Sequence, residues 1–201
     1  MELEHYKQYS YLKTCGLRSE ARQHLQQFID SFTSITEKEQ WTRQFLETEE
    51  HEYSYKIRHE LYESVVFPAL LSGYQRQDPW SLLWLARTAQ NFYKAKHLHE
   101  QIDLKTDYGL LKECYSLDPC NSEVKKGLVS IQLQWFQYCI HEYPIGVLYG
   151  WHGATFDECQ EILSEIKFVR ELDTEKVQEE FLNEVQSKVL EYLARPRINK
   201  K

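Results

Sequence analysis

Apolar residues recur three and four positions apart along almost the whole chain. The clearest run steps by four residues through Tyr53, Ile57, Leu61 and Val65. Because an α-helix turns once in about 3.6 residues, this spacing puts the apolar side chains on one helical face, where a shared core can bury them. Seven glycines and five prolines among 201 residues are too few for the many tight turns of a β-fold. We therefore predict an all-α fold.

Start and stop signals divide this pattern into about eight helices. Residues that favour helix N-termini stand at the start of several of them: Asp78, either Asn121 or Ser122, Asp173, and the capping-box pairs Thr36–Glu39 and Thr155–Glu158. The predicted helices cover residues 3–14, 19–33, 37–50, 53–71, 79–99, 105–117, 122–142 and 156–194, with a break in the last one near 172–173.

The predicted helices are joined by short connections, so consecutive helices should pack as antiparallel neighbours. A chain of 201 residues suits one domain. We expect a single helical domain over residues 1–201, with a basic, flexible tail at 195–201. Two arrangements remain open, an irregular bundle and a short α-solenoid-like array.

One segment favours the array. The stretch LLKECYSLDPCNSEVKKGL, residues 110–128, closes one predicted helix at Asp118–Pro119 and opens the next after Asn121. It looks locally like the end of a tetratricopeptide repeat, in which a Leu-Asp-Pro-x-Asn turn closes a helix. The resemblance implies a helix-turn-helix joint of the α-solenoid type. The preceding helix lacks that family's small-residue and aromatic spacing, so a compact bundle stays open.

The sequence carries no signal for export or membrane insertion. Its start, MELEHYKQYS, lacks the basic end and apolar run of a signal peptide. No apolar stretch approaches the roughly 18 residues of a membrane span. The five cysteines are odd in number and have no paired spacing, which is typical of reduced thiols. These features predict a cytoplasmic protein that has no membrane partner.

Negative charge is concentrated towards the C-terminus. The formal net charge is −7, and residues 155–194 hold eleven acidic and four basic side chains. The tail, 195–201, holds four basic ones. An acidic body repels phosphate, so we expect no direct binding to nucleic acid. The same charge attracts basic proteins and speeds their encounter.

The sequence lacks a complete catalytic or metal-binding motif. The segment HELYE, residues 59–63, opens like a zinc-protease helix, but Glu63 stands where the second histidine is needed. Cys139 and His141 are two residues apart, so they face apart on one helix and do not form a nucleophile–base pair. We therefore expect no enzyme activity, no cofactor and no metal.

The stretch HEYPIGVLYGWHGATFDEC, residues 141–159, stands out from its helical surroundings. It holds three of the seven glycines and one of the five tryptophans. Pro144 ends the preceding helix, and the glycines permit a tight fold. One interpretation is a structured corner whose apolar side chains enter the core: Ile145, Val147 and Leu148.

A second interpretation of the same stretch is a binding surface. Tyrosine and tryptophan dominate protein interfaces because they bury large areas with few rotatable bonds. An aromatic corner beside an acidic helix would suit a basic partner. The candidate partner-binding residues are the anchors Tyr149, Trp151 and His152 and the acidic residues Glu47, Glu49, Glu50, Asp157, Glu158, Glu161 and Glu165.

In charge and class, an acidic, tyrosine-rich helical chain without a catalytic motif resembles the acidic immunity or inhibitor proteins of bacterial toxin systems. The resemblance implies a non-enzymatic protein-binding module that neutralises a basic partner, such as a nuclease toxin, by covering its active site. One alternative is a helical-repeat adaptor that binds peptides in a concave groove. Another is an enzyme with a helical cavity around residues 141–153, which would use His141, Glu142 and His152.

Overall fold

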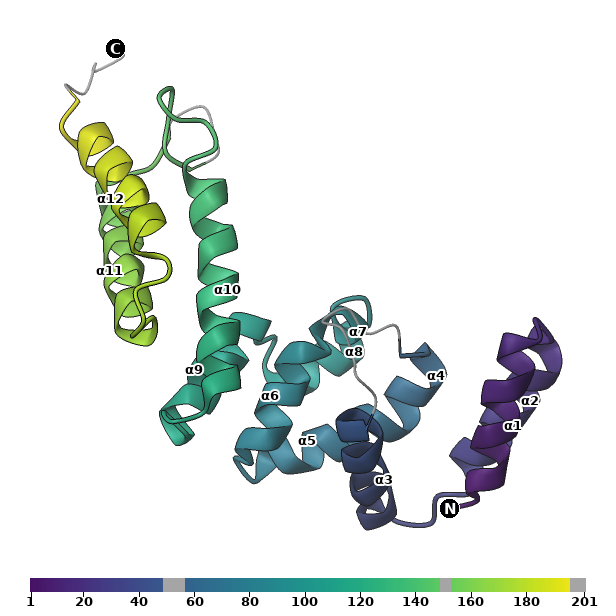
Figure 1. Cartoon of the computed structure of the whole chain (residues 1–201). Helices are drawn as coiled ribbons and strands as arrows, with labels where there is room; N and C mark the ends of the chain where they lie inside the picture. The colour runs from purple at the N-terminus through teal and green to yellow at the C-terminus, as the bar shows by residue number, and fades with distance from the viewer. Residues whose placement is uncertain (49–56, 149–152, 196–201) are drawn as a thin grey trace. The chain divides into compact units, whose positions relative to one another are not determined.

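The protein is built of helices and connecting turns in the computed structural model (Figure 1). The structure describes residues 1–48, 57–148 and 153–195, and these residues contain no β-strand. The all-α fold predicted from the apolar spacing is therefore confirmed. Helical segments are somewhat more numerous than expected, because one long predicted helix is divided.

The chain forms two compact units, Met1–Asp118 and Pro119–Lys201. The boundary falls at Asp118–Pro119, inside the turn that looks like the end of a tetratricopeptide repeat. Each unit has its own packed helices and is described by itself. The single domain suggested by the chain length stays a prediction.

The first unit contains a series of short and medium helices. Their bounds are α1 Leu3–Thr14, α2 Arg18–Asp30, α3 Ile35–Thr48, α4 His59–Leu61, the π-helical η1 Tyr62–Val66, α5 Phe67–Gln75, α6 Pro79–Arg87, α7 Ala89–Phe92, α8 Lys96–His99, the 3₁₀-helical η2 Glu100–Ile102 and α9 Asp107–Leu117.

The helix predicted over residues 79–99 is divided into α6, α7 and α8. At the end of α6, the hydroxyl of Thr88 donates to the carbonyl of Trp84 at 2.7 Å. Before α8, Ala95 leaves the helical conformation, with φ −123° and ψ 83°. Apolar spacing could not reveal these breaks, because Ala89 and Leu98 are buried on either side of the second one.

Pro68 lies inside a continuous helical run from α4 through η1 to α5. Proline has no backbone N–H, so the carbonyl of Ser64, four residues earlier, loses its usual helical partner. The π-helical turn at this point accommodates the disturbance. The Lys38 ammonium on α3 donates to the Ser64 carbonyl at 2.8 Å. This contact satisfies the open carbonyl and ties α3 to the run.

Aromatic rings hold the α1–α2 pair against α3. Trp41, which is 4% exposed, lies among rings from all three helices. Its ring centroid is 5.3 Å from that of Tyr6 on α1 and 5.1 Å from that of Phe28 on α2, and it stacks on Phe45 at 4.7 Å. Such ring pairs stabilise beyond the area that they bury. Much of the aromatic content of the first unit therefore serves its core.

Helices α5 and α6 approach closely at Gly73. A Cβ at this position would lie 1.9 Å from the Oγ of Ser81, so a larger residue would push the helices apart. Asp78 caps α6 as predicted: its carboxylate accepts from the Ser81 hydroxyl at 2.7 Å and from the Trp80 backbone N–H at 3.4 Å.

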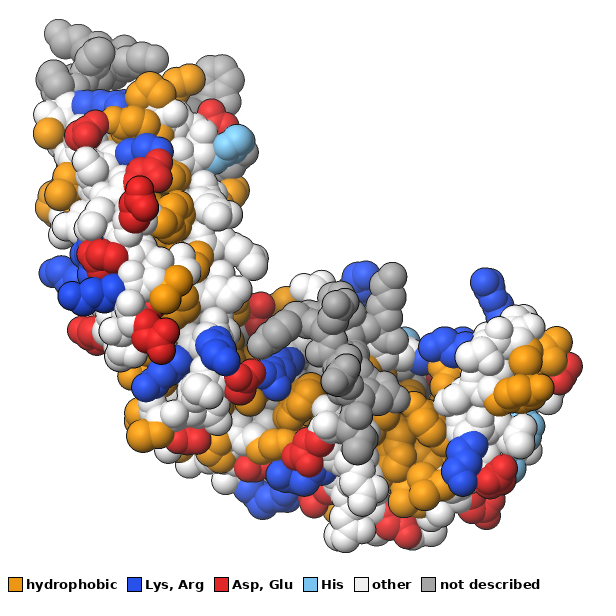
Figure 2. Space-filling view, viewed as in Figure 1, with side chains coloured by type: hydrophobic (Ala, Val, Ile, Leu, Met, Phe, Trp, Pro, Cys, Tyr) orange, Lys and Arg blue, Asp and Glu red, His pale blue; other side chains and the backbone are white. Residues whose placement is uncertain are grey.

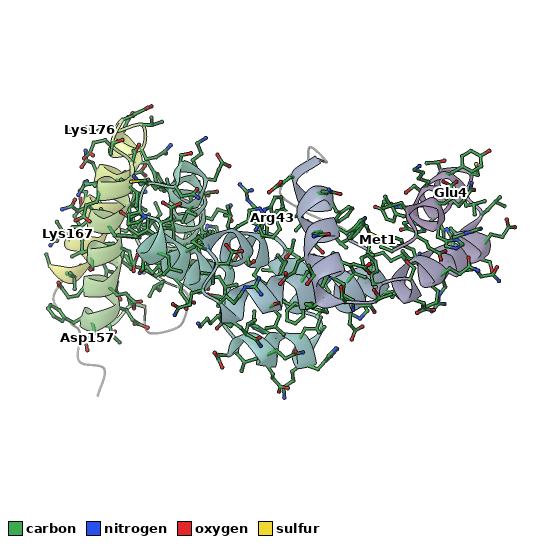
Figure 3. All side chains as sticks on the ribbon, turned by 90° about the horizontal axis from the view of Figure 1, so that it is seen from below. Met1, Glu4, Arg43, Asp157, Lys167 and Lys176 are labelled. Atoms are coloured by element: carbon green, nitrogen blue, oxygen red, sulfur yellow. The ribbon has the colours of Figure 1, made fainter. Side chains whose placement is uncertain are left out.

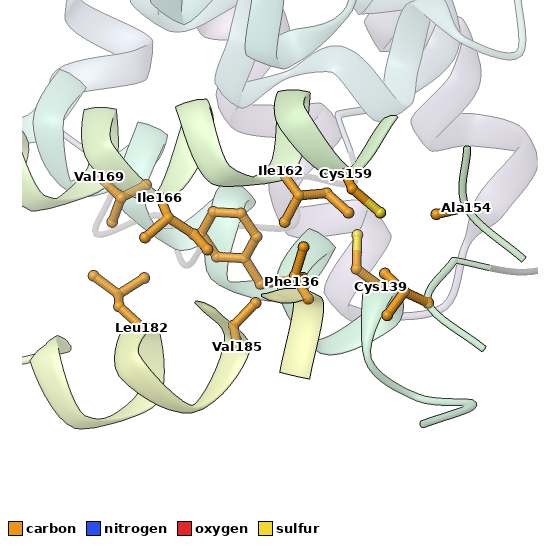
Figure 4. Packing of buried hydrophobic residues seen from close by; sticks show 11 residues of the cluster. Phe136, Cys139, Ala154, Cys159, Ile162, Ile166, Val169, Leu182 and Val185 are labelled. Atoms are coloured by element: carbon orange, nitrogen blue, oxygen red, sulfur yellow. The ribbon is translucent and has the colours of Figure 1, made fainter. Parts of the chain in front are cut away.

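The described part of the second unit holds α10 Ser122–Cys139, α11 Phe156–Leu172 and α12 Glu179–Leu193, which lie alongside one another (Figure 1). The predicted break after residue 172 is confirmed. Their inner faces meet around the ring of Phe136 (Figure 4). The rest of the buried cluster is aliphatic or sulfur-bearing: Cys139, Val147, Ala154, Cys159, Ile162, Ile166, Val169, Leu182, Val185 and Val189.

The predicted caps are confirmed at Asn121 and wrong at Thr36. The Asn121 side chain accepts from the backbone N–H groups that open α10. The capping contacts of α3 lie two residues earlier than predicted, because Ser34 Oγ accepts from the Glu37 N–H at 3.2 Å. Glu39, expected to complete the box, instead pairs with Arg76 at 2.9 Å. Both spacings fit the motif, and tertiary contacts select between them.

Polar contacts organise the connection from α11 to α12. The Asp173 carboxylate accepts from the backbone N–H of Gln178 at 2.7 Å, so it shapes the turn before α12 and not the first turn of that helix. The Arg170 guanidinium of α11 donates to three side chains of α12. These are Glu179 at 3.2 Å, Asn183 at 2.6 Å and Gln186 at 2.7 Å.

Candidate binding surface

Backbone hydrogen bonds close the corner between α10 and α11. The N–H of Leu148 donates to the Cys139 carbonyl at 2.8 Å, and the N–H of Ala154 donates to the Val147 carbonyl at 2.6 Å. Val147 is fully buried and Leu148 packs against the core, as a structured corner requires. The prediction is wrong for Ile145, which is 87% exposed because it lies at a tight turn that projects from the packed region.

Gly153 is required where the corner approaches α12. Its φ of +61° lies in the left-handed region that favours glycine. A Cβ here would lie 2.2 Å from the hydroxyl of Tyr192, which itself donates to the Ala154 carbonyl at 3.3 Å. The entry into α11 is therefore held in one position against α12.

Tyr143 anchors the other side of the corner. Its hydroxyl donates to Glu191 on α12, which raises the pKa of this tyrosine and lowers the pKa of the glutamate. The ammonium of Lys188 lies 5.5 Å from the Tyr143 ring centroid, and the guanidinium of Arg195 lies 5.3 Å from it. This side of the corner thus carries two positive charges, which Glu191 and Glu184, the ion-pair partner of Lys188, balance.

The predicted capping box at the start of α11 is confirmed. Thr155 Oγ1 accepts from the Glu158 N–H at 3.2 Å, and a Glu158 carboxylate oxygen accepts from the Thr155 N–H at 2.7 Å. The backbone bond from Thr155, followed by the bond from its hydroxyl, lowers the pKa of Glu158. Among the candidate acidic residues, Glu158 therefore has an internal structural role.

The other acidic residues of α11 divide into two kinds. Glu165 is half-buried and accepts from the Gln132 side-chain amide at 2.7 Å. Asp157 and Glu161, one turn apart, are exposed. Within the part of the chain that the structure describes, neither carboxylate takes part in a hydrogen bond or an ion pair. No described side chain therefore neutralises their charge.

Phe156 is an exposed aromatic side chain that the sequence did not single out. It is the first residue of α11 and is 53% exposed. Helical spacing places it one turn before the buried Cys159 and so suggests burial. Its position at the edge of the packed region leaves half of the ring uncovered. The Thr155–Glu158 capping box, which encloses Phe156, is the sequence signal that marks this edge.

The two ends of α11 differ in charge. Asp157 lies at one end of the helix, and Lys176 lies beyond the other end (Figure 3). Residues 155–166 contain four acidic and no basic side chains, whereas residues 167–180 contain three basic ones among five acidic ones. On α12, which faces the viewer in Figure 2, acidic, basic and apolar side chains are interspersed. The start of α11 is thus the more uniformly acidic end.

The remaining predicted site residues belong to the first unit or fall outside the described residues. Glu47 belongs to the first unit, where it is exposed near the end of α3 with its carboxylate 3.9 Å from Arg43. The others lie outside the described residues: Glu49, Glu50, Tyr149, Trp151 and His152.

The side chains considered for catalysis differ in their exposure to solvent. Cys139 is fully buried, which raises the pKa of its thiol to about 12. Such a thiol stays protonated near neutral pH and is a poor nucleophile. His141 is exposed and Glu142 is half-buried, while His152 lies outside the described residues.

Glu63, the residue that breaks the zinc-protease pattern, lies between two histidines. Its carboxylate oxygens are 3.1 Å from His59 Nε2 and 2.6 Å from His97 Nε2. The two histidine side chains are more than half exposed, and the Glu63 side chain is 38% exposed. Across the described ranges, no group of three or more His, Cys, Asp or Glu side chains is arranged to hold a metal ion.

Comparison of the chain with protein-family models, with curated proteins and with solved structures gives no match. No helix in the described ranges is both long enough and apolar enough to cross a membrane.

Proposed function

We propose that this chain is a non-enzymatic inhibitor, of the immunity-protein kind, that binds a basic protein through the start of α11. The observation that carries the proposal is the pair Asp157 and Glu161, which are exposed and without hydrogen-bond or ion-pair partners among the described residues. A charge that is not neutralised internally raises the rate of encounter with a cationic surface.

The rigid setting of this edge supports a binding role. The Thr155–Glu158 box fixes the first turn of α11, and Cys159 and Ile162 anchor its inner face in the core. A surface that is already ordered loses little conformational entropy on binding. The half-exposed ring of Phe156 adds apolar area that a partner would bury.

A nuclease is the kind of basic partner that fits these charges best. Its active site must attract phosphate and is therefore positively charged. A row of carboxylates on a helix can occupy such a site in place of the nucleic-acid backbone. The proposal accordingly predicts competition between this chain and nucleic acid for the partner.

The test compares two double variants of the full chain with the same change in net charge. Asp157→Lys with Glu161→Lys alters the proposed surface. Glu171→Lys with Glu180→Lys alters exposed positions elsewhere in the unit. Asp157 and Glu180 each lie in the first turn of a helix, so one substitution of each pair has a matched effect on the helix dipole.

Proteins captured by the wild-type chain from its native cells are purified and titrated by calorimetry. We expect a basic partner that binds the Asp157→Lys, Glu161→Lys chain at least about tenfold more weakly than it binds wild type. The control chain should lose much less affinity. We also expect the complex to block nucleic-acid binding by that partner. Equal affinity of wild type and the Asp157/Glu161 pair would reject this surface as the binding site.

A further inference from the structure

Two buried cysteines face one another at the corner of the second unit. Cys139 is the last residue of α10, and Cys159 lies in the first turns of α11. Both are fully buried. Figure 4 shows their thiol groups pointing towards one another inside the aliphatic cluster.

The backbone fixes this approach from both sides. The Cys139 carbonyl accepts from the Leu148 N–H at 2.8 Å, and the Cys159 N–H donates to the Thr155 carbonyl at 3.1 Å. Between them, the Ala154 N–H bonds to the Val147 carbonyl. The hydrogen bonds that close the corner thus position the backbone at both cysteines.

We propose that Cys139 and Cys159 form a redox modification site, at which the native chain acquires a disulfide when it meets a low-molecular-weight disulfide such as oxidised glutathione. The two protein S–H bonds break and one S–S bond forms between the cysteines. The S–S bond of oxidised glutathione breaks, and its sulfurs take up the two electrons and two protons as two thiols. The reaction passes through one mixed disulfide with glutathione. This proposal is independent of the proposed inhibitor function.

The other cysteines of the chain provide internal controls. Cys15 and Cys120 are exposed, so they should take up glutathione as mixed disulfides. Cys114 is buried in the first unit with its Sγ 3.2 Å from the Pro79 carbonyl, whereas the pair lies at the corner of the second unit. It should remain a thiol, because opening that corner does not expose it. Burial also makes the Cys139–Cys159 reaction slow, because the corner must open before glutathione can enter.

Peptide mapping of the wild-type chain tests the proposal directly. The folded chain is incubated with oxidised glutathione, trapped with an alkylating agent and cut with trypsin. Residues 127–166 contain no lysine or arginine, so both cysteines fall in the single peptide Gly127–Lys167. A second cut after Glu142 and Glu158 separates them unless a disulfide joins them.

The expected result is a Gly127–Lys167 peptide that has lost two hydrogens, is not alkylated, and gives two fragments joined until a reductant is added. If Cys139 and Cys159 are recovered as alkylated thiols or glutathione adducts while Cys15 and Cys120 have fully reacted, the proposal is overturned.

Thermal unfolding gives a second readout. A disulfide here closes the loop between residues 139 and 159, so oxidation should raise the Tm by about 5 °C or more, reversibly with dithiothreitol. The Cys159→Ala chain should show no such rise, and an equal rise in that variant would contradict the proposal. If this variant does not fold, the peptide map of the wild-type chain decides.

Discussion

The two compact units use aromatic side chains in different ways. In the first unit, rings from three helices interlock around Trp41. Among the described residues of the second unit, Phe136 is the one ring of the buried cluster. Phe156 is half-exposed, and four other rings pack at the edge of the cluster: Trp135, Tyr143, Phe181 and Tyr192. Aromatic content by itself therefore does not identify a binding surface. What matters is which rings the core leaves uncovered and what charge lies beside them.

The largest effect should come from breaking the ring cluster of the first unit. Trp41→Ala removes a buried ring with several aromatic neighbours and should lower the free energy of unfolding by about 3–5 kcal/mol. Urea titration measures the change. Trp80→Ala is the matched control, because Trp80 is only half-buried and carries Arg43 over its ring at 4.1 Å. An equal loss of unfolding free energy in the two variants would show that the ring cluster around Trp41 does not stabilise the first unit beyond an ordinary half-buried tryptophan.

The corner of the second unit should tolerate no side chain at Gly153. Gly153→Ala combines a left-handed backbone with a clash against Tyr192 and should cost about 1–3 kcal/mol. Gly109→Ala is the control, since its Cβ would meet Thr106 Oγ1 at an ordinary 3.5 Å within a helix. That change should be neutral or stabilise by up to about 1 kcal/mol. A similar destabilisation at both sites would contradict the described corner.

Arg170 provides a polar counterpart to the ring cluster. Arg170→Ala should lower the free energy of unfolding by about 1–2 kcal/mol, because three hydrogen-bonded side chains of α12 lose their donor. The exposed Lys167 on the same helix serves as the control, and Lys167→Ala should change stability by less than about 0.5 kcal/mol. If the two variants unfold alike in urea, the Arg170 contacts do not stabilise the helix pair.

The capping box should leave a small pH dependence in the second unit. Because folding lowers the pKa of Glu158, its stabilising contribution is present above the unfolded value near 4.5 and is lost as the pH falls through the lower folded value. Glu158→Gln should flatten the fall of Tm below about pH 4.5. Glu161→Gln removes an exposed carboxylate outside the box and should leave the fall of Tm at low pH as it is in wild type. A pH profile identical in wild type and Glu158→Gln would argue against the cap.

Local features were the most predictable from sequence. Asp78, Asn121 and the Thr155–Glu158 pair act on residues two or three positions away, so their partners are visible in the sequence. The exposure of Ile145 and the hydrogen bond between Glu165 and Gln132 depend on how distant segments pack. The spacing of apolar residues does not predict that packing. The acidic start of α11 was foreseen as a whole, but only coordinates separate the engaged carboxylates from Asp157 and Glu161.

In the proposed function, Asp157 and Glu161 attract a basic partner to the start of α11. Stopped-flow association with the purified partner, between low and high salt, tests it most directly. The association rate constant of the wild-type chain should be at least about tenfold lower at high salt than at low salt. The Asp157→Lys, Glu161→Lys chain should lose most of this dependence, whereas the Glu171→Lys, Glu180→Lys chain should keep it. The same salt dependence in all three chains would contradict the claim.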